Sequence, residues 1–252
     1  MSAVRYWAIV PAAGSGRRFG SELPKQFQRL GDKLVAEHSL SRLLAIQSIE
    51  KIIVPCDLAV SQWSEIPAAS DARVERVAGG AERVHSVLQG LHAIRDRADD
   101  NDWVLVHDMA RPCITSADIN RLVDQLRDND VGGILAAPVS DTLKRVAAKR
   151  MDEKRMAANN EPASELIEAT VDRSLFRAAQ TPQMFRYGIL LQALQTMLAD
   201  GQTPTDEASA VEYLGRPVAI VQGRRDNIKI THREDLVIAA AIMRYQETEQ
   251  CE

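Results

Sequence analysis

The sequence predicts an α/β fold built on a mostly parallel sheet with helices on both faces. Short runs rich in Val and Ile, bounded by Gly, Pro or Asp, are typical of strands. Segments with apolar residues at helical spacing lie between these runs. Apolar strands that alternate with amphipathic helices indicate a parallel sheet buried on both faces. Ligands of such sheets bind beyond the carboxyl ends of the strands, so motifs at those ends are the strongest candidates for a binding site.

The first part of the chain contains five expected strands and two clear helices. The expected strands cover 6–12, 51–55, 73–78, 103–107 and 133–139. Apolar side chains at 84, 88, 91 and 94 predict one helix, and those at 119, 122, 123 and 126 predict another. Thr115, Ser116 and Asp118 open the second helix, and these residue types favour an N-cap and a first turn.

The alternating pattern breaks between Ser140 and about Asp172. Two strand-like stretches, 141–147 and 166–172, flank the polar run 149–165. We expect a β-hairpin arm that projects from the body, the alternative being a surface insertion without a role. The segment QTPQMF at 180–185 follows, and after it we expect a helix at 187–198, a turn and helix at 205–215, a strand at 217–223 and a terminal helix from about 233. We therefore predict a single domain, 1–252, with a dimerisation arm at about 140–172.

Composition excludes several classes of protein. The chain has 252 residues, 45% of them hydrophobic, which suffices for a folded core. Its net charge of −4 argues against a general nucleic-acid binder. The longest apolar run, Leu236 to Met243, is too short to span a membrane, and no signal pattern opens the chain. Cys56, Cys113 and Cys251 are too widely spaced for a metal site. We expect a cytoplasmic protein with reduced thiols.

A glycine-rich segment, Pro11 to Gln26, follows the first expected strand. Gly14 and Gly16 permit close approach of the backbone to a phosphate. Gly20 falls one residue late for a dinucleotide fingerprint, and the segment lacks the ending of a Walker loop. Its basic side chains are Arg17, Arg18 and Lys25. A polyanion such as a nucleoside triphosphate is the expected ligand, and a glycine turn with solvated Arg and Lys is the alternative.

Further candidate motifs follow two later strands. The double glycine Gly79-Gly80, with Ser86 beyond it, is a β-to-α turn when considered alone. Asp108 ends the most apolar strand, and a carboxylate at that edge suits Mg²⁺, which takes few carboxylates and keeps phosphate and water ligands. The alternative is a loop residue paired with Arg111. Several polar residues of the arm and the last strand have an ordinary surface character by themselves: Thr142, Lys144, Arg173, Thr181, Asp226 and Lys229.

Taken together, the motifs resemble one family closely. The segments PAAGSGRRF, PKQ, AGGAERVHSV, VHDMARP, DTLKR, TVDR, TPQMF, TDEASA and DNIKIT, in this order, are similar to 2-C-methyl-D-erythritol 4-phosphate cytidylyltransferases. The resemblance runs from about Trp7 to Asp235. It implies a Rossmann-like sheet of the nucleotidyltransferase type, and transfer of CMP from CTP to 2-C-methyl-D-erythritol 4-phosphate with release of pyrophosphate. It further implies Mg²⁺ as cofactor, a homodimer, and a place in non-mevalonate isoprenoid synthesis.

The resemblance also assigns roles to individual residues. Arg18 and Lys25 would stabilise the transition state. The nucleotide would contact Pro11, Ala12, Ala13, Gly14, Gly16, Gly80, Arg83, Ser86, Asp108, Ala110 and Arg111. The acceptor would contact Thr142, Arg173, Thr181, Asp226 and Lys229, with Arg173 reaching across a dimer interface. The metal would lie near Asp108 and Asp226.

Two positions depart from the family pattern, and other functions stay open. Ala81 stands where some members carry an acid, and Met109 stands where most carry Ala. The same fold serving another alcohol phosphate, such as ribitol 5-phosphate, is the main alternative. A nicotinamide dehydrogenase is disfavoured by the misplaced Gly20, and a non-catalytic regulator is disfavoured by the intact basic residues.

Overall fold

The computed structural model describes residues 4–14, 19, 23–147 and 166–249. The chain divides into two compact units. The larger contains Met1–Ala136 and Ala179–Glu252, and the smaller contains Ala137–Ala178. The expectation of a single domain stays a prediction.

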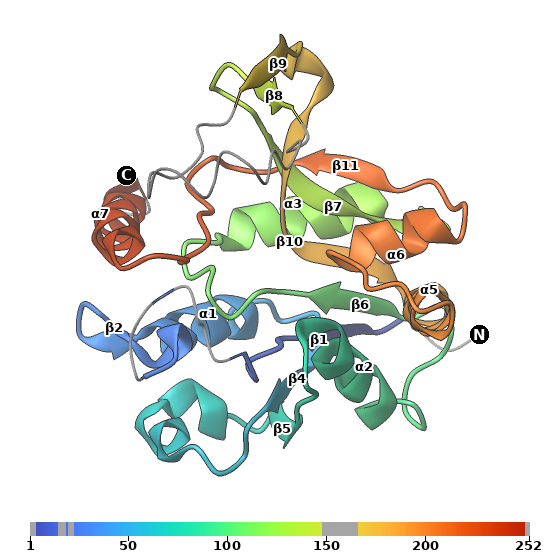
Figure 1. Cartoon of the computed structure of the whole chain (residues 1–252). Helices are drawn as coiled ribbons and strands as arrows, with labels where there is room; N and C mark the ends of the chain where they lie inside the picture. The colour runs from blue at the N-terminus through green and yellow to red at the C-terminus, as the bar shows by residue number, and fades with distance from the viewer. Residues whose placement is uncertain (1–3, 15–18, 20–22, 148–165, 250–252) are drawn as a thin grey trace, which may run out of the picture. The chain divides into compact units, whose positions relative to one another are not determined.

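A seven-stranded sheet with the order β11-β7-β10-β6-β1-β4-β5 organises the larger unit (Figure 1). Its strands are β1 (Tyr6–Ile9), β4 (Ile49–Cys56), β5 (Val74–Ala78), β6 (Trp103–Val106), β7 (Gly132–Pro138), β10 (Arg177–Arg186) and β11 (Ala219–Gln222). Strand β1 pairs in parallel with β4 and β6, β4 with β5, and β11 with β7. Strand β10 runs antiparallel to β6. The mostly parallel sheet is therefore confirmed.

Side chains of alternate residues in the strands enter two hydrophobic cores. On β1, Ala8 belongs to one core and Trp7 and Ile9 to the other. Helices α1 (Val35–Leu44) and α3 (Ser116–Leu126) pack into the first core. Helices α2 (Arg83–Ala93), α5 (Tyr187–Ala199) and α6 (Glu207–Tyr213) pack into the second. Helices thus cover both faces, as the alternating pattern predicts.

A third cluster surrounds the C-terminal helix α7 (Glu234–Glu249), which packs against Ile230 and Cys113. The remaining elements are short. They are η2 (Lys25–Phe27), β2 (Arg29–Leu30), β3 (Lys33–Leu34), η3 (Ser61–Glu65), η4 (Pro67–Ser70), β8 (Lys144–Val146), β9 (Ile167–Thr170) and η5 (Arg173–Leu175). None of the helices in the described ranges combines the length and the apolar character that a membrane crossing requires.

The cap expected for the second helix is confirmed, because the Thr115 hydroxyl accepts the N–H of Asp118 at 3.1 Å and α3 begins at Ser116. Helix α1 was not expected. Its N-cap is Leu34, which provides no side-chain hydrogen bond, and the helix follows β3 directly. The sequence there lacks the polar residue that normally marks a helix start.

The smaller unit contains the antiparallel pair β8 and β9, with Lys144 opposite Thr170 and Arg145 opposite Ala169. The Lys144 ammonium donates to the Thr170 hydroxyl at 2.7 Å. The two paired strands of the arm are therefore confirmed. The polar connection expected at 149–165 lies outside the described residues.

Candidate functional site

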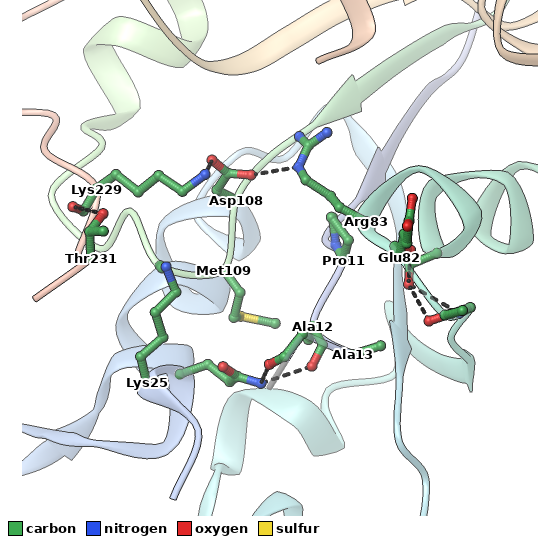
Figure 2. A pocket seen from close by; sticks show the side chains of 16 residues that line it. Pro11, Ala12, Ala13, Lys25, Glu82, Arg83, Asp108, Met109, Lys229 and Thr231 are labelled. Atoms are coloured by element: carbon green, nitrogen blue, oxygen red, sulfur yellow. Dashed lines mark hydrogen bonds and ion pairs between the residues drawn. The ribbon is translucent and has the colours of Figure 1, made fainter. Parts of the chain in front are cut away.

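A cavity of about 590 Å³ opens where β1, β5 and β6 end (Figure 2). Register places these ends near one another, because Ile9 of β1 pairs with Ile53 of β4 and with Val106 of β6, and Ala78 of β5 pairs with Cys56 of β4. The predicted residues that line the cavity are Pro11, Ala12, Ala13, Gly14, Lys25, Gly80, Arg83, Ser86, Asp108, Ala110 and Lys229. The structure therefore brings most of the expected nucleotide contacts to one place.

Other predicted residues lie elsewhere. Arg111, Thr181 and Asp226 are outside the lining, although Thr181 accepts the backbone N–H of Asp108 at 3.0 Å. The exposed Thr142 and Arg173 belong to the smaller unit, where Arg173 donates to the Ser140 carbonyl. The predicted Gly16 and Arg18 lie outside the described residues.

The segment Pro11 to Gly14 continues directly from β1. The Ala12 N–H donates to the Pro55 carbonyl at 2.8 Å, so the backbone beyond the end of β1 remains hydrogen-bonded to β4. The amide of the buried Gln26 donates to the Ala12 carbonyl at 2.9 Å. Gln26 holds this segment in place and was missed as a functional residue, although the PKQ motif contains it.

At the double glycine, the backbone packs closely against two neighbouring residues, Ala13 and His85. A Cβ at Gly79 would lie 2.5 Å from the Ala13 Cβ, and one at Gly80 would lie 2.3 Å from the His85 Cβ. No side chain fits at either position. The Gly80 N–H donates to the Ser86 hydroxyl at 3.1 Å, which ties the turn to the first turn of α2.

Asp108 lies two residues beyond β6 and is 7% exposed. Lys229 and Arg83 reach its carboxylate from opposite sides at 2.8 and 3.0 Å, as Figure 2 shows. Burial alone would raise the pKa of this carboxyl. The positive charges of Arg83, Lys229 and Arg111 outweigh burial, and the pKa of Asp108 lies well below its usual range. The carboxylate is therefore charged at neutral pH.

Arg83 connects Asp108 to a second carboxylate, that of Glu207. The two terminal nitrogens of Arg83 donate to the Glu207 oxygens at 2.6 and 3.0 Å. Burial by itself would lower the pKa of Arg83. The negative charges of Glu207 and Asp108 outweigh burial and raise this pKa above its usual value, so the guanidinium stays charged. Glu207 is 1% exposed and was not predicted as a site residue, although the TDEASA motif contains it.

The position of Glu207 follows from the cap of α6. The Asp206 side chain accepts the Ser209 N–H at 2.9 Å in a capping box. Gln183 of β10 then donates to Asp206 at 2.9 Å and accepts the Ala208 N–H at 2.9 Å. Strand β10 and helix α6 together fix the carboxylate that holds Arg83.

The two lysines of the cavity come from distant segments. The Lys25 ammonium, in η2, donates to the Ile230 carbonyl at 2.7 Å. Lys229 precedes that residue directly, so both cations lie beside the same short stretch of backbone. Two cations near the segment at Pro11 form a surface suited to a polyanion.

The two departures from the family pattern both line the cavity. Met109 is 3% exposed and also belongs to the core that contains α1, where its carbonyl accepts the Ser39 hydroxyl at 2.7 Å. Its side chain therefore contacts both the core and the cavity. Ala81 contributes no charged side chain to the turn, and Glu82, the next residue, also lines the cavity.

The residues present limit what the site could hold. Across the described ranges, no three His, Cys, Asp or Glu side chains gather as a metal-binding group. The Asp226 carboxylate pairs with Arg224 at 2.8 Å and accepts the Gln246 amide at 3.1 Å. A metal in the cavity would thus find Asp108 as its buried carboxylate and would depend on ligand oxygens for the rest.

Comparisons with known proteins identify the family of the chain. The family model for IspD, 2-C-methyl-D-erythritol 4-phosphate cytidylyltransferase, matches residues 6–245. A protein of that name from Pseudomonas savastanoi is 44% identical over 232 residues, covering 92% of both chains. Another from Hahella chejuensis is 44% identical over 240 residues, covering 95% of this chain and 93% of the relative.

Solved structures show the same likeness. The crystal structure of a 4-diphosphocytidyl-2C-methyl-D-erythritol synthase has a TM-score of 0.77 and 33% identity, covering 96% of this chain and all of its own. The Francisella tularensis cytidylyltransferase has a TM-score of 0.76 and 30% identity, covering 94% and 99%. The chain belongs to the 2-C-methyl-D-erythritol 4-phosphate cytidylyltransferase family, nucleotidyltransferases that transfer CMP from CTP to 2-C-methyl-D-erythritol 4-phosphate in the isoprenoid precursor pathway.

Proposed function

We propose that the cavity binds CTP, with the triphosphate beside Pro11 to Gly14 and Lys25 and the base at the turn from Gly80 to Ser86. The observation that carries this proposal is that these two segments, far apart in sequence, line one cavity together with Asp108. Backbone N–H groups and lysines suit phosphates. We expect the tight turn at Gly80 to favour a pyrimidine over the larger purine.

The reaction requires no nucleophile from the protein. A phosphate oxygen of methylerythritol 4-phosphate attacks the α-phosphorus of CTP, the bond from that phosphorus to the oxygen of the β-phosphate breaks, and pyrophosphate leaves with the bonding electrons. The protein contributes positioning and charge neutralisation. Lys25, held by the Ile230 carbonyl, would meet the charge that develops at the α-phosphate, together with Arg18.

Lys229 would hold the phosphate of the acceptor, because its ammonium lines the cavity beside Asp108. The resemblance adds Arg173 and Thr142 from the arm, and Asp226 from the body. Arg173 would serve the site of a partner subunit in a symmetric homodimer. Exposed apolar side chains in the smaller unit support a buried partner surface, and they are Val146, Leu166, Ile167, Leu175 and Phe176.

Mg²⁺ would bind the phosphates of CTP, with Asp108 as its protein ligand. One buried carboxylate in the cavity fits this ion, which takes one or two carboxylates and otherwise prefers phosphate and water oxygens. When bound, the ion neutralises phosphate charge. Asp226, the other predicted ligand, is paired with Arg224 away from the lining.

We also propose a cytoplasmic location. Cys56 and Cys113 are buried free thiols, which fits a reducing compartment. Burial raises the pKa of Cys56 to about 11 and of Cys113 to about 12, so neither thiol is reactive at neutral pH.

A pyrophosphate-release assay tests the substrate assignment. CTP, UTP, ATP and GTP are each offered with methylerythritol 4-phosphate, and CTP is then offered with ribitol 5-phosphate. We expect turnover with CTP and methylerythritol 4-phosphate to exceed every other pair. Comparable turnover with a purine nucleotide would remove the proposed base site, and a preference for ribitol 5-phosphate would change the acceptor.

A further inference from the structure

A fully buried histidine braces the turn that carries Asp108. His107 follows β6 directly and is 0% exposed. Its Nε2 lies 3.2 Å from the Arg111 carbonyl oxygen, and its Nδ1 lies 3.0 Å from the Thr181 hydroxyl. That hydroxyl also accepts the Asp108 N–H at 3.0 Å. The imidazole therefore joins the two ends of the four-residue turn that begins at Asp108.

The Arg111 carbonyl oxygen determines the direction of the hydrogen bonds that connect Arg111, His107 and Thr181. A carbonyl oxygen can only accept, so Nε2 of His107 carries the hydrogen. A neutral imidazole has one N–H, and complete burial favours the neutral form, so Nδ1 has a lone pair. The Thr181 hydroxyl therefore donates to Nδ1, and its own oxygen accepts the Asp108 N–H.

We propose that His107 is a positioning residue for CMP transfer, because its ring holds the turn from Asp108 to Arg111 at a fixed width and so fixes the wall against which CTP lies. Asp108, Met109 and Ala110 all line the cavity. The functional part of the inference depends on the proposed place of CTP, whereas the hydrogen-bond direction does not.

The hydrogen bond to His107 also limits which hydrogen bonds the Thr181 hydroxyl can form with a ligand. Its hydroxyl hydrogen is used by His107, so the oxygen can only accept further hydrogen bonds. An ionised phosphate has no hydrogen to offer it, and in this arrangement Thr181 cannot hold the acceptor phosphate. Its backbone is also fixed, because the Asn227 amide donates to the Thr181 carbonyl at 2.9 Å. Thr181 is then a positioning residue like His107.

Nuclear magnetic resonance tests the direction on the wild-type protein. Two-bond ¹H–¹⁵N correlations distinguish a ring protonated at Nε2 from one protonated at Nδ1. We expect the His107 ring, identified by its loss in His107→Asn, to show the Nε2–H form at neutral pH. The Nδ1–H form would overturn the proposed hydrogen-bond directions at His107, whether or not CTP binds in the cavity.

Kinetics test the role in the reaction. A misplacement of about 1 Å in a catalytic wall can cost about 10²-fold in rate. We expect His107→Leu, which removes both hydrogen bonds, to lower kcat by roughly 10- to 100-fold while KM for CTP changes less than about threefold. His107→Asn keeps an acceptor for the Thr181 hydroxyl and should recover part of the loss.

His38→Asn is the matched control, since His38 lies 2.8 Å from the Leu30 carbonyl in another part of the fold and should leave kcat unchanged. Unchanged kcat in folded His107→Leu would overturn the proposal. If that variant does not fold, Thr181→Val breaks the same chain of hydrogen bonds. We expect it to lower kcat, whereas a rise in KM for methylerythritol 4-phosphate alone would place the hydroxyl on the acceptor and overturn the inference.

Discussion

Arg83, which lines the cavity, and Glu207 form a bidentate ion pair with nitrogen to oxygen distances of 2.6 and 3.0 Å. The pair places the remaining nitrogen of Arg83 within 3.0 Å of Asp108. A planar guanidinium with both outer nitrogens engaged cannot rotate without breaking both bonds. Glu207 thus controls the orientation of Arg83, and through it the position of Asp108.

Glu207→Gln should therefore weaken both the fold and the site. The amide offers one acceptor instead of two and removes the charge that compensates Arg83. Because Arg83 is about one-third exposed, we expect a loss of about 1.5–3 kcal/mol in the free energy of unfolding. Urea denaturation measures the loss, and kcat/KM for CTP should fall as well.

Glu212→Gln is the control for this change, since Glu212 lies on the exposed face of the same helix and should alter neither quantity. Equal stability and kcat/KM in Glu207→Gln and Glu212→Gln would show that the ion pair does not position the site.

This pair also shows what the sequence could not predict. The cap of α3 was predictable because Thr115 and Asp118 are three residues apart. Strands β1 and β6 were predictable because their burial leaves a local apolar pattern. Arg83 and Glu207 are separated by 124 positions, and His107 and Thr181 by 74. No local pattern encodes such contacts, which arise only when the fold brings α2, α6, β6 and β10 together.

Family resemblance located the walls of the cavity better than it located its supports. Gly80, Asp108 and Lys229 were predicted and line the cavity. Gln26 and Glu207 lie within quoted motifs, yet nothing in the motifs says that they hold a backbone segment or an arginine. Their roles depend on burial and hydrogen-bond geometry, which a motif does not specify.

Lys25→Ala should lower kcat far more than it weakens CTP binding. Removing one donor that stabilises the transition state costs roughly 2.7–4 kcal/mol, or about 10²-fold or more in rate. Arg18→Ala should behave in the same way. Steady-state kinetics give kcat, and calorimetric titration with CTP gives the affinity. Equal losses in both quantities would instead assign Lys25 to ground-state binding.

Stability should fall as the pH drops below neutral, because His107 is buried in its neutral form. Burial lowers the pKa of His107 to about 4, with the positive charge of Arg111 lowering it further and Asp108 opposing. The unfolded chain binds a proton near pH 6.5, whereas the folded chain does not until about pH 4. The free energy of unfolding therefore decreases between these values, by up to about 1.4 kcal/mol for each pH unit.

Urea unfolding between pH 4.5 and 7.5 measures this slope. His107→Asn lacks the titrating ring and should show a shallower slope over that window. His92→Asn, which alters an exposed histidine, should keep the wild-type slope. Parallel slopes in all three proteins would mean that His107 does not take part in the acid destabilisation.

We predict that the arm of each subunit contributes a residue to the active site of its partner. Strands β8 and β9 form an isolated pair of short strands with exposed apolar side chains, and such a pair is marginally stable unless it packs against another surface. If Arg173 serves the partner's site, Arg173→Ala should raise KM for methylerythritol 4-phosphate more than KM for CTP. The lost contact is charge-assisted and contributes roughly 1.5–3 kcal/mol.

Mixing two defective proteins tests the sharing directly. In a dimer of one Arg173→Ala subunit and one Lys25→Ala subunit, one site contains both defects and the other contains neither. Statistical exchange makes about half of the dimers mixed, so roughly a quarter of all sites should be intact and activity should return to that level. Differently tagged subunits and a pull-down establish that exchange has occurred. If exchange is complete and activity stays absent, Arg173 does not act across the interface, because a residue serving its own subunit leaves every site in the mixture with one defect.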